Sequence, residues 1–312
     1  MEIKASIVLP TYNRAWCLGN AIRSALAQTE PNMELIVVDN ASTDSTTDVV
    51  SHFTDPRVRY YRQTTMVEVA ANWGEGLMRA RGPYVAFLCD DDLLGPMFLE
   101  NRLRRFASRT DAAVVFSRYE RRRINGTKES EQNADWIEEK ILGPQDLLLT
   151  ALAKRWLIGA ALYRRDAVVA AWDSVSSDDL VFDFSLNLHF AIKGLHGVYI
   201  PECDFVMGVH PGQSSRARQG DVFNQAQRLL KRLLNDSVPT SMKAPVRREL
   251  SSWLTLHGRR LASFGELCQA RRCFRRALGA DVSYVAAWRS LAQSWLCPKR
   301  LEASTKRQFE VT

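Results

Sequence analysis

The sequence predicts an α/β fold, with a mixed, mostly parallel sheet flanked by helices and an all-helical C-terminal extension. Two observations carry this prediction. In the first two thirds of the chain, short β-rich runs alternate with segments of helical periodicity, and from residue 223 onward the pattern is helical throughout. Strands and helices that alternate at this spacing form βαβ units with right-handed crossovers.

The N-terminal part is expected to contain eight strands and five longer helices, with a polar insertion between them. The strands are expected at 3–9, 33–38, 58–61, 84–88, 112–116, 159–163, 198–201 and 205–207, with a hairpin or mobile insertion at 118–139. The helices are expected at 16–28, 67–81, 96–107 and 144–153, and as a run from 183 to 193. Pro10 is expected to end the first strand, and Gly82-Pro83 to end the second helix.

The stretch at 84–94 organises the chain. Its continuous apolar run is typical of a parallel strand covered on both faces, and it ends in Asp90, Asp91 and Asp92. Ligands collect at the carboxyl ends of such strands, and a divalent metal carrying phosphates would compensate three adjacent carboxylates. The alternative is a solvated turn with a helix N-cap. Three loops, at 10–14, 39–44 and 89–92, are expected to converge on this edge of the sheet.

Composition is that of a soluble globular protein. The 312 residues are 46% hydrophobic and 25% charged, and no apolar run approaches the ~20 residues of a membrane span. The N-terminus shows no signal-peptide pattern, and the six cysteines show no CxxC pairing. We therefore expect reduced thiols and a cytoplasmic location.

Charge is distributed unevenly along the chain. Residues 221–312 hold 17 Lys and Arg against 7 Asp and Glu, whereas the preceding residues carry a net −3. Such a segment suits an anionic membrane surface or phosphates, and the alternative is an arginine-rich solvated helix face. The basic region lacks interleaved exposed aromatic residues, so nucleic-acid binding is not expected.

One helix pair in the extension has the spacing of a tetratricopeptide repeat. Gly258, Ala270, Phe274 and Ala277 fall at the offsets of that motif, with Trp253 near the expected aromatic position. A single repeat cannot bury its own apolar face. We therefore expect this pair to pack on the preceding domain or on another subunit, as in a homo-oligomer.

Three blocks of the N-terminal part resemble the family 2 glycosyltransferases. They are Pro-Thr-Tyr-Asn-Arg at 10–14, Val-Val-Asp-Asn-Ala-Ser-Thr-Asp at 37–44, and Phe-Leu-Cys-Asp-Asp-Asp at 87–92. Their order and spacing agree over residues 3–120, and the resemblance continues more weakly to about residue 216. It implies a GT-A fold and an inverting transfer from a nucleotide-diphosphate sugar.

The resemblance also implies a domain organisation. The glycosyltransferase domain is expected at 1–220, with a nucleotide-binding half at 1–117 and an acceptor half at 118–220. The helical extension at 221–312 lies outside the resemblance.

Carried over residue by residue, the resemblance implies a nucleotide site. Tyr12 would stack on or beside the base, Asp39 would accept a hydrogen bond from it, and Asp90 would contact the ribose. The nucleotide-binding residues it implies are Pro10, Thr11, Tyr12, Arg14, Asp39, Asn72 and Asp90. For Tyr12 the alternative is a tyrosine of the core, and for Asp39 it is a helix or turn cap. Asp44 would fix its loop or touch the nucleotide, and Arg79 and Arg81 fit helix-surface charges better than phosphate contacts.

The same resemblance implies a metal site. Asp91 would be the principal ligand, and Asp92 would support the metal or cap the next helix. His210 would reach the metal, as a third protein ligand, or the diphosphate, and the alternative is a structural histidine. Asp90 and Asp92 also form a literal DxD, so the ligating pair stays open, and Cys89 stands where many members have Asp. Hard oxygen ligands select Mn²⁺ or Mg²⁺. Arg216 and Arg218 would clamp phosphates.

Asp183 is the candidate general base. It resembles the end of an acidic block that precedes a helix in the family, although Phe182 occupies the position usually held by Glu. The base would take the proton of an acceptor hydroxyl as that oxygen attacks the anomeric carbon. Asp178 and Asp179 are rivals, and each of the three acids also suits a helix N-cap.

The resemblance therefore implies a glycosyltransferase that extends a glycan or lipid-linked oligosaccharide in surface polysaccharide synthesis, with a UDP-sugar favoured as donor. It would act on the cytoplasmic side of a membrane, with peripheral contact through the basic helices. A non-catalytic sugar-nucleotide-binding scaffold is one alternative. A nucleotidyltransferase is another, although such enzymes usually carry a Gly-rich basic loop where this chain has Pro-Thr-Tyr-Asn-Arg.

Overall fold

The computed structural model describes residues 2–123, 125–210, 219–236, 238–301 and 303. The chain divides into two compact units, Met1–Gln213 and Ser214–Thr312. The sequence-based boundary at residue 220, and the division of the first domain at residue 117, stay predictions. Each unit is described by itself below.

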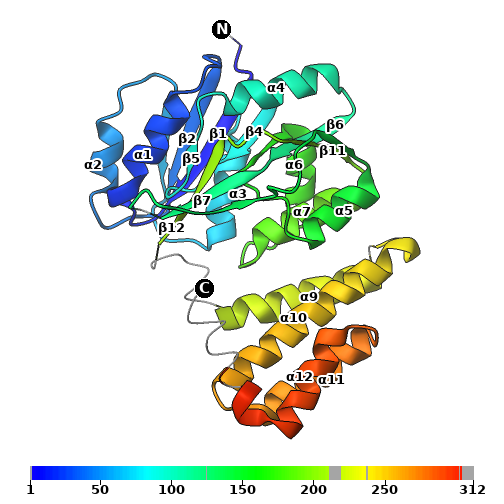
Figure 1. Ribbon diagram of the computed structural model, residues 1–312. Coiled ribbons are helices and arrows are strands. Elements are labelled where there is room, and N and C mark those ends of the chain that lie inside the picture. Colours follow the sequence, from blue (N-terminus) through cyan, green and yellow to red (C-terminus); the bar gives the residue numbers. More distant parts are fainter. Residues whose placement is uncertain (1, 124, 211–218, 237, 302, 304–312) are drawn as a thin grey trace. The chain divides into compact units, whose positions relative to one another are not determined.

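The first unit is built on an eight-stranded sheet (Figure 1). Its strand order is β3-β2-β1-β4-β10-β6-β11-β9. In that order the strands are Val58–Arg62, Met33–Asp39, Ala5–Thr11, Tyr84–Phe87, Ala161–Arg164, Ala112–Ser117, His196–Ile200 and Lys140–Leu142. Strands β1 to β4 are mutually parallel, and β10 and β9 run antiparallel to their neighbours. The predicted mixed, mostly parallel sheet is therefore confirmed.

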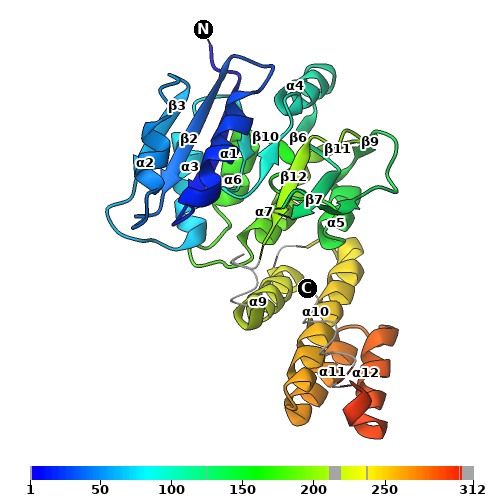
Figure 2. The ribbon, with the colours of Figure 1, turned by 60° about the vertical axis from the view of Figure 1, so that its left-hand side comes forward.

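Helices cover both faces of this sheet (Figure 2). They are α1 Ala15–Leu26, α2 Thr46–Ser51, α3 Val69–Arg79, α4 Phe98–Ser108, α5 Pro144–Leu152, α6 Arg165–Trp172 and α7 Phe182–Ile192. Strand side chains alternate between faces. Ile7 and Leu9 of β1 belong to the core cluster of α1 and α4. Val8 lies on the other face, where it meets α3 at Gly76.

A second, four-stranded sheet has the order β5-β12-β7-β8. Its strands are Leu93–Leu94, Phe205–Val209, Tyr119–Arg123 and Lys128–Gln132. The predicted hairpin in 118–139 is confirmed, because β7 and β8 pair antiparallel. Gly126 in its turn has φ +85°, a left-handed conformation that glycine adopts without steric cost.

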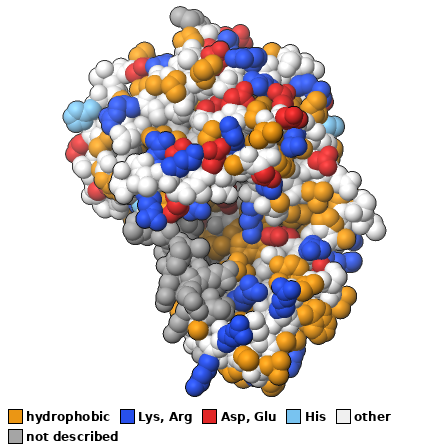
Figure 3. Space-filling model, in the orientation of Figure 1, with side chains coloured by type: hydrophobic (Ala, Val, Ile, Leu, Met, Phe, Trp, Pro, Cys, Tyr) orange, Lys and Arg blue, Asp and Glu red, His pale blue; other side chains and the backbone are white. Residues whose placement is uncertain are grey.

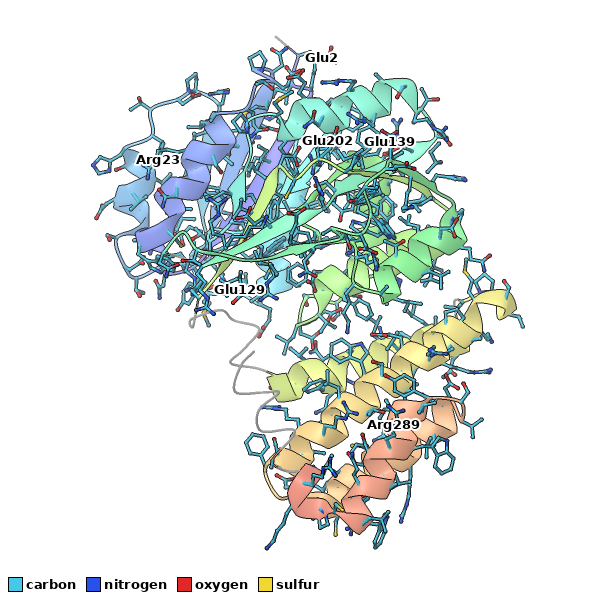
Figure 4. The ribbon with its side chains drawn as sticks, in the orientation of Figure 1. Glu2, Arg23, Glu129, Glu139, Glu202 and Arg289 are labelled. Atoms are coloured by element: carbon cyan, nitrogen blue, oxygen red, sulfur yellow. The ribbon has the colours of Figure 1, made fainter. Side chains whose placement is uncertain are left out.

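Buried and half-buried arginines of α4 tie the two sheets together. The fully buried Arg102 donates to Ser117 Oγ at 2.6 Å and pairs with Asp204 at 2.9 Å. Arg105 pairs with Glu202 at 2.7 Å and with Glu139 at 3.1 Å, and both acids are labelled beside α4 in Figure 4. These pairs fix the segment that leads into β12.

The structure departs from the sequence prediction at short elements. Helix α6 and strands β5 and β9 were not predicted, and β1 continues through Pro10 to Thr11. The β4 pairing ends at Val8, so the missing N–H of Pro10 costs no ladder hydrogen bond.

The second unit is helical. It contains α9 Gln219–Asp236, η1 Thr240–Met242, α10 Lys243–Ser263, α11 Leu267–Ala280 and α12 Val285–Leu296. Gly258 lets α10 approach α11 closely, since a Cβ there would lie 2.5 Å from the Phe274 ring. Trp253 faces α9 instead, with its ring 5.6 Å from that of Phe223. Both α9 and α12 pack on the α10–α11 pair within the unit.

Candidate active site

The three predicted loops converge at the carboxyl ends of β2, β1 and β4. Thr11 Oγ1 donates to Asp90 Oδ2 at 2.8 Å, which joins the loop after β1 to the loop after β4. Asn13 N–H donates to Ser42 Oγ at 2.9 Å, which joins it to the loop after β2. These strands are neighbours in the sheet, so their polar ends meet. The convergence is confirmed.

Asn13 shapes the first loop, and sequence reasoning gave it no role. Its backbone has φ 52°, a left-handed conformation in which asparagine is several-fold enriched. Its side-chain oxygen accepts from Thr43 N–H at 2.7 Å. Asp44 fixes the same loop by accepting from Ala15 N–H at 3.1 Å and Thr46 N–H at 3.0 Å. The loop-fixing alternative for Asp44 is what the geometry supports.

Asp39 is fully buried, and both of its carboxylate oxygens have partners. Oδ1 accepts from Ser42 N–H at 2.9 Å and Oδ2 from the Tyr60 hydroxyl at 2.7 Å, with Arg62 Nε at 3.5 Å. Asp39 therefore organises the loop, and its contact with the base stays a prediction.

Tyr12 and Asn72 differ in their accessibility to a nucleotide. Tyr12 is 43% exposed, so its ring is free to stack on a base. Asn72 is buried and donates to the Val38 carbonyl at 3.0 Å, which anchors α3 on the end of β2.

Two arginines near α3 take structural roles. Arg79 pairs with Glu75 and lies over the Tyr61 ring at 4.5 Å. The backbone N–H of Arg81 donates to Glu34 at 2.7 Å. Neither contact involves the three loops at 10–14, 39–44 and 89–92, which agrees with the expectation that these arginines are surface charges and not phosphate ligands.

Asp90 is held by the first loop. It accepts from Thr11 and from the Tyr12 N–H, and Arg14 Nε lies 3.9 Å from Oδ1. Burial, followed by repulsion from Asp91, raises the pKa of this carboxyl to about 7.

Asp91 lies against His210. The Asp91 Oδ2 and His210 Nε2 atoms are 2.8 Å apart, and the imidazole is almost fully buried. The Trp16 ring contacts His210 edge-on at 5.2 Å. Strand β12, which ends one residue earlier, carries His210 to the aspartates across a separation of more than a hundred residues.

Asp92 is held by β12 as well. Its Oδ1 accepts from Gly208 N–H at 2.9 Å. A Cβ at Gly208 would lie 2.1 Å from the Asp91 carbonyl oxygen, so only glycine permits this approach. Burial and the charge of Asp91 raise the pKa of Asp92 well above its usual range. Sequence reasoning missed Gly208, whose only signal is a glycine inside a strand.

The group fits a divalent cation. Ligand atoms of Cys89, Asp91 and Asp92 all lie within 4.8 Å of one another. The raised pKa values of Asp90 and Asp92 express crowded, desolvated negative charge that a cation would relieve. The carboxylate oxygens and the imidazole suit Mn²⁺ or Mg²⁺, whereas a thiol is a softer ligand.

Asp183 is the second residue of α7. Its Oδ1 accepts from Phe184 N–H at 2.7 Å, and burial, reinforced by Asp179, raises its pKa. Asp183 and Asp92 both act on the phenol of Tyr119, whose pKa burial raises to about 12. Tyr119 thus lies near both acids, and sequence reasoning did not single it out.

The rivals of Asp183 lie in the turn before α7. Asp178 is exposed and bonds with Ser176, and Asp179 accepts from Val181 N–H at 2.9 Å. Asp179 therefore caps that turn. Arg216 and Arg218 lie outside the described residues.

Comparison with known proteins identifies the family. The model of glycosyl transferase family 2 matches residues 6–170. A putative teichuronic acid biosynthesis glycosyltransferase, TuaG of Bacillus subtilis, is 31% identical over 158 residues, which cover 49% of this chain and 58% of TuaG. The chain thus spans little more than half the length of this relative.

Solved structures share the fold. TarS 1–349 of S. aureus in complex with UDP-GlcNAc gives a TM-score of 0.71 at 16% identity, over 98% of this chain and 92% of that one. The mannosyltransferase PcManGT of Pyrobaculum calidifontis, in complex with GDP-Man and Mn²⁺, gives 0.60 at 17% identity, over 98% and 85%. The predicted GT-A fold is confirmed. The chain belongs to glycosyl transferase family 2, as its three sequence blocks predicted.

Proposed function

We propose that the chain is an inverting, divalent-metal-dependent glycosyltransferase. It moves a sugar from a nucleotide-diphosphate donor, with a UDP-sugar favoured, to a hydroxyl of a glycan or lipid-linked oligosaccharide in surface polysaccharide synthesis. One observation carries the proposal: Asp90, Asp91 and Asp92 meet at one strand end, and each has a different partner, Thr11, His210 and Gly208 respectively.

The named complexes support the donor class. The TarS structure holds UDP-GlcNAc and the mannosyltransferase holds GDP-Man with Mn²⁺. TuaG is named for teichuronic acid biosynthesis, a polysaccharide pathway. For this chain, we infer a nucleotide-sugar donor and a surface-glycan acceptor from these names together with its own site.

Asp91, Asp92 and His210 would hold the metal. Asp91 and His210 are in contact, and Asp92 shares the cluster with Cys89. When bound, a divalent ion neutralises the charge that develops on the diphosphate leaving group.

The first loop would bind the nucleotide. Tyr12 offers an exposed ring, and Asp90, fixed by Thr11, is positioned to accept from ribose hydroxyls. Arg14 lies beside Asp90 and supplies a positive charge on the same side of the site.

Asp183 would act as the base. It takes the proton of the acceptor hydroxyl while that oxygen bonds to the anomeric carbon and the bond from that carbon to the diphosphate oxygen breaks. Attack from the face opposite the leaving group inverts the anomeric centre. A raised pKa makes the carboxylate a stronger base at neutral pH.

A non-catalytic scaffold is the second candidate, and Phe182 favours it. The residue is buried and its ring lies 4.8 Å from that of Trp73, so an aromatic cluster fills the position where the family usually carries a glutamate. Metal-dependent UDP binding without transfer of sugar to any acceptor would support the non-catalytic scaffold.

We place the protein on the cytoplasmic side of a membrane, in peripheral contact through its basic helices. Among the described residues, no helix has the length and apolarity to cross a bilayer. The excess of Lys and Arg in residues 221–312 supports attraction to anionic lipid.

The test is substitution of the principal ligand. Asp91→Ala should abolish donor hydrolysis and transfer, with a loss of at least about 100-fold because metal contributes several kcal/mol. Asp111→Ala, an exposed acid paired with Arg109, is the matched control and should keep full activity. Normal turnover of the Asp91 variant, with folding checked by circular dichroism, would refute the metal assignment.

A further inference from the structure

The helical unit contains a basic pocket, defined by Asn224, Gln227, Arg228 and Lys231 of α9 together with Arg276 of α11. Asp221 also lines it, and its volume is about 290 Å³. Three cations thus share a small concave site with one carboxylate. The side chains on this unit are drawn in Figure 4.

The cations of the basic pocket form no ion pair with any described residue, although Asp221 lines the same pocket. Among the residues that the structure describes, no carboxylate lies within ion-pair distance of Arg228, Lys231 or Arg276. Burial, followed by repulsion from Arg276, lowers the pKa of Lys231. Like charges held this close favour an anion between them.

Gln227 of the basic pocket is fixed by contacts within the helical unit. Gln227 is buried, and its Nε2 atom lies 3.1 Å from His257 Nδ1 on α10. His257 in turn stacks on Phe223, with the rings 5.4 Å apart and almost parallel. Gln227 is therefore held in place within the unit, and Asn224 and the three cations supply further donors to the pocket.

We propose that the basic pocket binds the phosphate of an anionic lipid headgroup. Guanidinium and ammonium groups together form charge-assisted hydrogen bonds with phosphate oxygens. A volume of this size accommodates a headgroup phosphate and excludes a folded macromolecule.

The rest of the unit favours a bilayer as the source of that phosphate. Large apolar side chains are exposed on it, with Phe264 at 67%, Trp295 at 57% and Leu296 at 80%. On the face drawn in Figure 3, Lys and Arg side chains of this unit are interleaved with hydrophobic ones. Basic charge attracts anionic leaflets, and tryptophan is enriched at membrane interfaces.

The experiment measures vesicle binding without any nucleotide sugar, so its result is independent of the transferase proposal. Full-length protein is co-sedimented with phosphatidylcholine vesicles that contain or lack phosphatidylglycerol. Lys231→Gln/Arg276→Gln should weaken binding to the anionic vesicles about tenfold or more, because both side chains lose charge-assisted hydrogen bonds to the bound phosphate.

A charge-matched control separates the basic pocket from general attraction. Arg247→Gln/Arg248→Gln removes the same charge from exposed positions of α10 that do not line the pocket, so it reports general attraction alone and should weaken binding clearly less than the pocket variant. Equal losses in the two variants, or no preference for the anionic vesicles, would overturn the proposal. Soluble glycerol phosphate should raise the melting temperature of the protein less than anionic vesicles do. An equal rise would assign the pocket to free phosphate and overturn the lipid source.

Discussion

Each of the three adjacent aspartates has its own partner. Thr11 holds Asp90, His210 contacts Asp91, and the Gly208 N–H holds Asp92. Thr11 ends β1, whereas Gly208 lies in β12 and His210 directly follows it, so each carboxylate has its own environment and is suited to its own task. The division that the sequence resemblance implied, with ribose for Asp90 and metal for Asp91, is compatible with these contacts.

Asp90 makes the stability of the metal-free protein depend on pH. Its pKa rises from an ordinary 3.8 to about 7 on folding, so the carboxyl stays protonated to a higher pH in the folded state than in the unfolded state. Stability should therefore fall as pH increases from about 4 to about 7, by at most roughly 4 kcal/mol. Urea unfolding of the N-terminal unit, at about pH 5 and about pH 7.5, measures this loss.

The matched variant for this prediction is Asp90→Asn, which removes the titrating group. Its free energy of unfolding should depend less on pH than that of the wild type. Mn²⁺ should flatten the wild-type dependence in the same way, because bound cation favours the ionised carboxylates. An unchanged slope in the variant would show that Asp90 does not carry this effect.

Asp183 should determine turnover but not donor binding. Asp183→Asn is expected to lower donor hydrolysis by about 10²–10⁴-fold while the affinity for UDP with Mn²⁺ stays the same. The wild-type rate should rise with pH as Asp183 ionises, from a pKa raised by burial. Asp179→Asn is the control, and a larger loss in that variant would move the base to Asp179.

At the scale of elements, α3 lies unusually close to the sheet. A Cβ at Gly76 would be 2.3 Å from Val8 Cγ1 and 3.1 Å from Val38 Cγ2. Asn72, one turn earlier, bonds to the end of β2. This close approach positions the loop after β2, which faces the candidate nucleotide site.

Gly76→Ala and Gly19→Ala form a matched pair of helical substitutions. Gly76→Ala should destabilise the protein by about 1–3 kcal/mol, because the methyl group overpacks against β1. Gly19→Ala in α1 should be neutral or stabilise by up to about 1 kcal/mol, since its Cβ would meet the flexible end of Arg23 at 3.5 Å and Val49 Cγ1 at 3.7 Å, both ordinary contact distances. Thermal melting compares the two, and equal effects would contradict this packing of α3.

Elements with strong local signals could be predicted from the sequence. The apolar runs of β1, β2, β4 and β6 are predictable because each is continuous and almost entirely buried. Strand β5 has two residues and exists through its pairing with β12, which no local pattern encodes. Helix α6 has eight residues, too few for a clear helical period.

The loop residues of the candidate site could be predicted from the sequence, whereas the residues that the four-stranded sheet brings to it could not. The blocks at 10–14, 39–44 and 89–92 carry short-range patterns that the family model also matches. Gly208 reaches Asp92 through the tertiary placement of β12, and Tyr119 of β7 is placed where burial, and then Asp92 and Asp183, raise the pKa of its phenol. No local sequence pattern encodes either placement.

At the scale of the whole molecule, we expect chemistry and attachment to be divided between the two units. The family match ends at residue 170, inside the first unit, and the excess of basic charge lies in the second. We infer that the first unit carries out transfer and that the second holds the protein near its acceptor. We expect donor and acceptor choice to lie in residues 118–215, which follow the three recognised sequence blocks.

The measurement that tests the central claim most directly is a panel of UDP-, GDP- and dTDP-linked sugars, screened for Mn²⁺-dependent hydrolysis and thermal stabilisation. The account predicts that at least one donor, with a UDP-sugar favoured, stabilises and is hydrolysed only with metal, and that Asp91→Ala loses both effects. Failure of every donor with metal present, or equal effects without metal, would contradict it.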